Sequence, residues 1–193
     1  ITCRCPCIWK MSYFTANILR TEKIASDVIS HLGLSRFGSG PHILRDHRNW
    51  KEGEIRLLSI WTAAVQPSFA DEYLLVSMRI DSEKQGTGLQ WPDHRLVSAR
   101  VVQNTNRIAE IRQLDDPAGL DLPEEALMTI PWKSRDQTIS LDGTGYCFIL
   151  DTFSLTSSLT FANPRDGALA QLADYFADAV STVAGAGSVV FTA

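Results

Sequence analysis

The sequence holds four histidines, and two of them lie close to the same aspartate, Asp46. His42 precedes Asp46 by four residues, and His47 follows Asp46 directly. Side chains four residues apart share one face of a helix, where a carboxylate can orient a histidine that acts as a general base. His42, Asp46 and His47 are therefore candidate catalytic residues of a small hydrolase or transferase. Pro41 and Gly53 bracket the stretch and favour the alternative, a solvated polar segment.

A second candidate site follows the polar, glycine-containing stretch at residues 82–88. Trp91 could close a pocket there, and His94 could change its charge near neutral pH. Because binding side chains often lie in loops, Trp91, Asp93 and His94 are candidate binding residues. The structural alternative is a tryptophan that fixes the loop to the edge of a sheet. We favour that alternative, because a single histidine is a weak signal.

The cysteines and the acidic residues predict no metal site and no cofactor. Cys3, Cys5 and Cys7 are spaced too closely for the two pairs of ligands that hold a tetrahedral zinc ion. Cys147 lies between two aromatic residues, which predicts a small buried core side chain rather than a reactive thiolate. The carboxylates of residues 115–125 lack the residue order of an EF-hand loop, so we expect a solvated acidic connector.

Length and composition predict one globular domain, since the chain has 193 residues, of which 45% are hydrophobic and 21% charged. The net charge of −4 comes without a cluster of Lys and Arg, so we expect no nucleic-acid binding. No apolar run approaches the roughly 20 residues of a membrane helix, so we expect no membrane insertion. The uneven distribution of the cysteines predicts a cytoplasmic protein.

The first ten residues differ in character from the chain that follows them. Three of the four cysteines fall there, and Met11 comes directly afterwards. We therefore predict that Met11 is the natural start, that residues 1–10 are a non-native or disordered extension, and that residues 11–193 form a single domain.

Two amphipathic helices are expected, one near each end of the chain. Apolar residues recur at three- and four-residue spacing in residues 21–32, with Thr21 as the N-cap and Gly33 as the stop. The second helix is expected to begin at Asn163 and Pro164, which suit an N-cap and a first helical position. Gly185 is expected to end it.

Between the helices the apolar residues recur with a period of two, which is typical of strands. Strands are expected over residues 55–62, 73–81, 96–103, 107–113, 137–141, 146–151 and 155–161, with a turn at Asn104-Thr105-Asn106. Because no helix intervenes, the fold class is α+β: an antiparallel meander sheet of about six or seven strands. The N-terminal and C-terminal helices are expected to pack together on one face.

No catalytic motif or reactive group of residues stands out in the sequence. The function best supported is therefore a non-enzymatic protein-binding or interaction module, of the inhibitor or immunity kind, with another protein as its partner. Its tryptophans, a residue type enriched at interface hot spots, support this interpretation. The alternatives are the small hydrolase or transferase described above and a small-molecule-sensing domain. The oligomeric state is left open.

Overall fold

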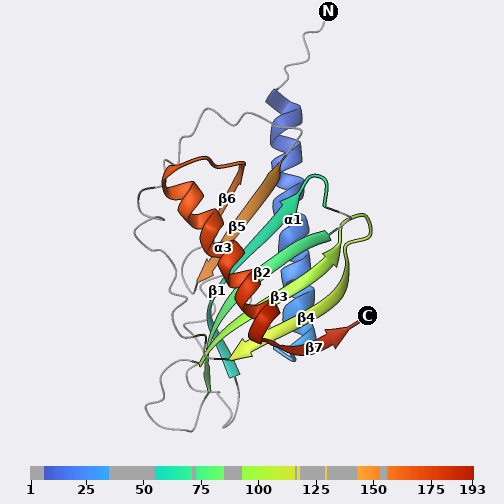
Figure 1. Cartoon of the computed structure of the whole chain (residues 1–193), viewed down its shortest axis with the longest axis vertical. Helices are drawn as coiled ribbons and strands as arrows, with labels where there is room; N and C mark the ends of the chain where they lie inside the picture. Colours follow the sequence, from blue (N-terminus) through green and yellow to red (C-terminus); the bar gives the residue numbers. More distant parts are fainter. Residues whose placement is uncertain are drawn as a thin grey trace, which may run out of the picture.

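The computed structural model describes residues 7–34, 55–70, 73–84, 93–115, 117, 129, 143–152 and 156–193. Two long helices and seven strands make up this part of the chain (Figure 1). In chain order they are α1 (Cys7–His31), β1 (Ile55–Pro67), β2 (Tyr73–Lys84), β3 (Asp93–Val102), β4 (Arg107–Asp115), β5 (Thr144–Thr152), β6 (Thr156–Ala162), α3 (Gly167–Ala186) and β7 (Ser188–Thr192).

The strands form one open sheet in the order β6-β5-β1-β2-β3-β4-β7, and every neighbouring pair is antiparallel. The predicted α+β class with an antiparallel sheet is therefore confirmed. The meander itself holds only from β1 to β4. β5 returns to pair with the other side of β1, β6 adds to β5, and β7 adds to β4 after α3. The antiparallel pair of β1 and β2 therefore lies in the middle of the sheet, and the later strands are added on both sides of it.

The two helices cover opposite faces of the sheet, so the prediction that they share one face is wrong. Figure 1 shows α3 in front of the strands and α1 behind them. One hydrophobic cluster joins α1 to the sheet through Ile24, Val28 and Ile29. A separate cluster joins α3 to the other face through Leu172 and Phe176.

The physical reason is visible in β1, whose side chains are apolar on both faces. Ile60 and Ala64 belong to the cluster under α1, whereas Trp61 and Ala63 belong to the cluster under α3. Successive side chains of a strand point to opposite faces, so a strand that is apolar at every position must be covered on both sides. One helix on each face supplies that cover.

Both helices differ from prediction at their starts. α1 already begins at Cys7, and Thr21 is an interior residue whose hydroxyl donates to the carbonyl of Asn17 at 2.9 Å. A threonine hydroxyl inside a helix is satisfied in this way without ending it. The predicted stop at Gly33 is confirmed, since its φ of +70° is a conformation that glycine adopts readily. α3 begins at Gly167, after Asp166 as N-cap, and not at Asn163.

Arg112 on β4 ties α3 to the sheet. Its Nη1 donates to the carbonyl of Ala184 in the last turn of α3 at 3.1 Å, and its Nε donates to Glu110 at 2.8 Å. A guanidinium at the C-terminal end of a helix satisfies a carbonyl that the helix itself leaves open. The hydrogen bond from Arg112 lowers the pKa of the Glu110 carboxyl below its usual value, so Glu110 stays ionised and keeps the guanidinium in place.

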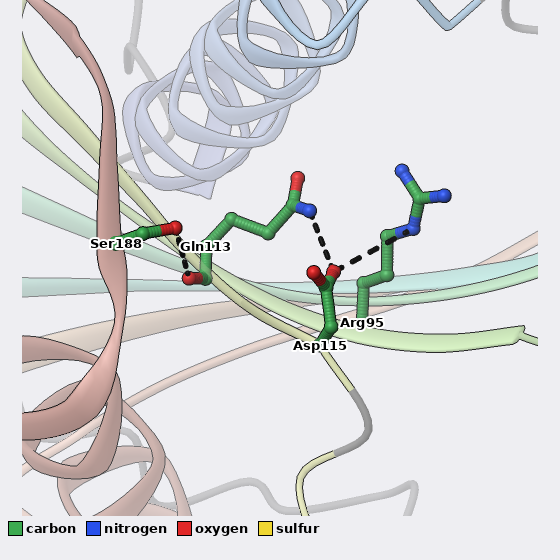
Figure 2. A network of polar contacts seen from close by, with 4 residues as sticks. All are labelled: Arg95, Gln113, Asp115 and Ser188. Atoms are coloured by element: carbon green, nitrogen blue, oxygen red, sulfur yellow. Dashed lines mark hydrogen bonds and ion pairs between the residues drawn. The ribbon is translucent and has the colours of Figure 1, made fainter.

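A second polar network holds the beginning of β7 against β4 (Figure 2). The hydroxyl of Ser188 donates to the carbonyl of Gln113 at 3.2 Å, and the side-chain amide of Gln113 donates to Asp115 at 2.6 Å. The Nε of Arg95 lies 3.9 Å from the same carboxylate. The side chains of this network lie on the face that carries α1 (Figure 2). The chain is thereby fixed in place where it passes from α3 into β7.

Candidate functional site

Three connections of the chain meet at one end of the sheet, where β1 ends, β5 begins and β6 leads into α3 (Figure 1). We call residues 68–70, 143–146 and 163–166 the turn end. The N–H of Ser68 donates to the carbonyl of Gly143 at 2.7 Å, and the N–H of Asn163 donates to that of Thr144 at 3.0 Å. Segments far apart in the sequence are therefore joined here by backbone hydrogen bonds.

Asn163 and Gly143 give the turn end its shape. Asn163 has a φ of +45°, and its side-chain oxygen accepts a hydrogen bond from the N–H of Thr144 at 2.7 Å. Asparagine tolerates this left-handed conformation better than most residues do. Gly143 has a φ of +134°, and a Cβ at this position would overlap the side chain of Asn163. Asn163 therefore serves to join β5 to the segment after β6, and this explains why α3 begins later than predicted.

An open pocket of about 350 Å³ lies between the beginning of β5 and the first turns of α3. The residues that line it are Thr144, Tyr146, Asn163, Pro164, Arg165, Ala170, Ala173 and Asp174. The Tyr146 ring stacks on Phe161 with a centroid distance of 4.9 Å, which fixes the position of its hydroxyl. Burial, helped by the negative charge of Asp174, raises the pKa of that hydroxyl, so Tyr146 is neutral at physiological pH. The pocket therefore offers a neutral hydroxyl, a guanidinium and a carboxylate.

Phe69 lies in the turn end, one residue beyond Ser68, and 76% of its surface is exposed. It is the most exposed of the large hydrophobic residues that the structure describes. A phenylalanine contributes little to folding when water surrounds it, but it can release about 1.5–3 kcal/mol when it becomes fully buried. Sequence reasoning missed Phe69, Tyr146, Arg165 and Asp174. The one available signal was an aromatic residue placed two positions after the proline that ends β1.

The structure tests the predicted site residues only in small part. His42, Asp46, His47 and Trp91 lie outside the described residues, so their roles stay predictions. Asp93 opens β3 opposite Ser82 of β2. His94 follows it, half-buried and opposite Asp81. The structure therefore places two of the three candidate binding residues on a strand rather than in a loop.

Cys147 is fully buried on β5 within the cluster under α1, as its aromatic neighbours predicted. Burial raises the pKa of its thiol to about 11, and a hydrogen bond with Thr21 only partly offsets this effect. A thiol with this pKa stays protonated at neutral pH and is a poor nucleophile. Cys147 is therefore a core residue. Trp61 is likewise a core anchor, with 2% of its surface exposed.

Alkaline conditions are expected to destabilise the protein through Cys147. The folded-state pKa of about 11 lies above the ordinary value of 9.0, so the folded protein holds this proton more tightly than the unfolded chain does. The stabilisation is complete below pH 9 and is lost as the pH rises through 11, to a total of about 2–3 kcal/mol. Urea unfolding measures this loss as the dependence of the free energy of unfolding on pH. It is carried out on the wild type and on Cys147→Ala between pH 8 and about pH 11. A slope that is equally steep in both proteins would contradict the assignment.

The described residues contain no group of three or more His, Cys, Asp and Glu side chains that could hold a metal ion. Among the helices in this part of the chain, none is long and apolar enough to cross a membrane. A scan against models of known protein families, a search of curated proteins and a search of solved structures each found no match. The site must therefore be interpreted from its own residues.

Proposed function

We propose that this protein is a non-enzymatic interaction module that binds another protein at the turn end. The observation that supports this proposal is the position of Phe69, a large exposed aromatic side chain in the turn end, which also contributes Thr144, Asn163 and Arg165 to an open polar pocket. Protein interfaces combine this kind of apolar anchor with a polar surround, and aromatic residues and arginine are enriched in them. The turn end carries both components.

Each component has a distinct part in recognition. Phe69 supplies apolar area that a partner removes from water, and this accounts for affinity. Arg165 and Asp174 carry opposite charges around Tyr146, so a partner must present complementary groups in one orientation. The hydrogen bonds of Asn163 and Gly143 hold the surface in place before binding, which reduces the entropy that binding costs.

Site-specific photo-crosslinking tests this proposal. A photoreactive phenylalanine analogue at position 69 is expected to yield a discrete covalent adduct with one protein in an extract of the source cells. Arg165→Glu should reduce that adduct at least tenfold, because about 1.4 kcal/mol of lost binding energy corresponds to a factor of ten. The matched control places the same analogue at Ala177, an exposed position on the solvent side of α3.

Two outcomes would contradict the proposal. One is an identical set of adducts from positions 69 and 177, since adducts that do not depend on position reflect random collision. The other is an adduct at position 69 whose yield does not change with Arg165→Glu. That result would show that the pocket has no part in recognition.

A further inference from the structure

β7 forms one edge of the sheet among the strands that the structure describes. The strand order ends with it, and β4 is its neighbour on the inner side (Figure 1). An edge strand presents a row of backbone N–H and C=O groups that can pair with another strand. β7 is therefore a surface where a further strand can be added, and it is separate from the turn end.

The side chains of β7 do nothing to block such pairing. The strand has no charged residue and no proline, two of the features by which edges are commonly protected. Val189 and Val190 are 51% and 43% exposed. On the opposite edge of the sheet, β6 exposes only the polar or small residues Thr156, Ser158 and Ala162. The apolar exposure is thus particular to the β7 edge.

Contacts on the inner side of β7 also hold the strand in place, so that its outer edge is ready for pairing. The N–H of Ala193 donates to the carbonyl of Ala109 at 3.0 Å, and the Phe191 ring contacts His31 of α1 at a centroid distance of 4.3 Å. The network in Figure 2 anchors Ser188 at the other end. Val190 is skipped in the register between β4 and β7, where a bulge falls between the partners of Ile111 and Arg112. Val190 is therefore not committed to a cross-strand pair within its own sheet.

The order of residues in β7 identifies the partner that fits. The five residues of β7 form a pattern that is symmetric about Val190. A polar residue stands at each end, Ser188 and Thr192, and three apolar residues lie between them. If a second copy approaches in the antiparallel direction, hydroxyl lies opposite hydroxyl and apolar opposite apolar. Val190 then faces its own counterpart on the two-fold axis. A two-fold interface between identical strands requires this self-complementarity, whereas pairing with an unrelated strand does not require it.

We propose that the protein forms a two-fold dimer by antiparallel pairing of β7 with β7 of a second copy, which joins two sheets into one continuous sheet. The strand has five residues, so the contact is smaller than a permanent dimer interface. The dimer is therefore reversible and its population depends on protein concentration.

Sedimentation velocity from low to high micromolar protein tests the proposal. The wild type is expected to shift from monomer to dimer across this range. Val190→Lys should remain a monomer throughout, because the two ammonium groups would face each other at the axis. Leu19→Lys is the matched control: Leu19 is 59% exposed on α1, and its replacement should leave the shift unchanged.

A charge-swap mixture makes the test specific for β7. Val190→Lys and Val190→Glu should each be monomeric alone, and an equimolar mixture should form a heterodimer because opposite charges then meet at the axis. The proposal would be overturned by a wild type that stays monomeric at the highest concentration. It would equally be overturned by a dimer that survives Val190→Lys, or by a mixture that remains monomeric. None of these outcomes bears on the turn end, whose test uses different residues.

Discussion

Replacing Phe176 with alanine is expected to lower the free energy of unfolding by about 3–5 kcal/mol. Phe176 is completely buried at the centre of the cluster under α3. Its ring lies 5.8 Å from that of Trp61 and 5.5 Å from that of Phe148. The substitution removes these contacts and leaves a cavity that a rigid sheet on one side cannot close. Urea unfolding followed by tryptophan fluorescence measures the effect as a lower midpoint at an unchanged slope.

The same substitution at Phe69 is the matched control. Phe69→Ala removes an identical side chain from a position that is 76% exposed, and we expect a change below about 0.5 kcal/mol. Similar losses at the two positions would contradict the assignment of Phe176 to the core and of Phe69 to a free surface. The pair therefore separates the residue that holds α3 in place from the residue that is available to a partner.

The fold class could be predicted from the sequence because most elements obey one simple period. β2 alternates from Val76 to Asp81, and its Leu74, Val76, Met78 and Ile80 all fall in the cluster under α1. The hairpin between β3 and β4 was predicted from its asparagines, and Asn106 indeed has a φ of +54°. Local rules of this kind depend only on neighbouring residues, so a sequence can reveal them.

The position of the second helix could not be predicted from its own sequence. The apolar stripe of α3 shows that one side is buried, but not which face of the sheet it meets. The relevant signal lay in β1 and β5, whose central residues are apolar at nearly every position and so need cover on both faces.

β7 and the pocket escaped prediction for different reasons. Val189, Val190 and Phe191 are consecutive apolar residues with a bulge at Val190, so β7 lacks the alternation by which a strand is recognised. The pocket is assembled from segments that meet only through the hydrogen bonds of Asn163 and Gly143. Such long-range contacts leave no periodic pattern in the chain.

Replacing Ile29 with alanine is expected to lower the free energy of unfolding by about 2–5 kcal/mol. Ile29 is 1% exposed on α1 and packs within the cluster on the other face of the sheet. Leu19→Ala, on the same helix but 59% exposed, should change the stability by less than about 0.5 kcal/mol. Urea unfolding measures the change in the free energy of unfolding for both variants. A small effect of Ile29→Ala would show that α1 is not packed on the sheet as described.

Combining changes on the two faces tests the three-layer arrangement directly. The milder substitutions Ile29→Val and Phe176→Leu keep the double variant folded, each with an expected cost of about 0.5–1.5 kcal/mol. The two residues belong to separate clusters with the sheet between them, so their costs should add to within about 0.5 kcal/mol. If both helices packed against one shared core, the two side chains would compete for the same space. A larger interaction energy in the double variant would then appear and contradict the opposite placement of α1 and α3.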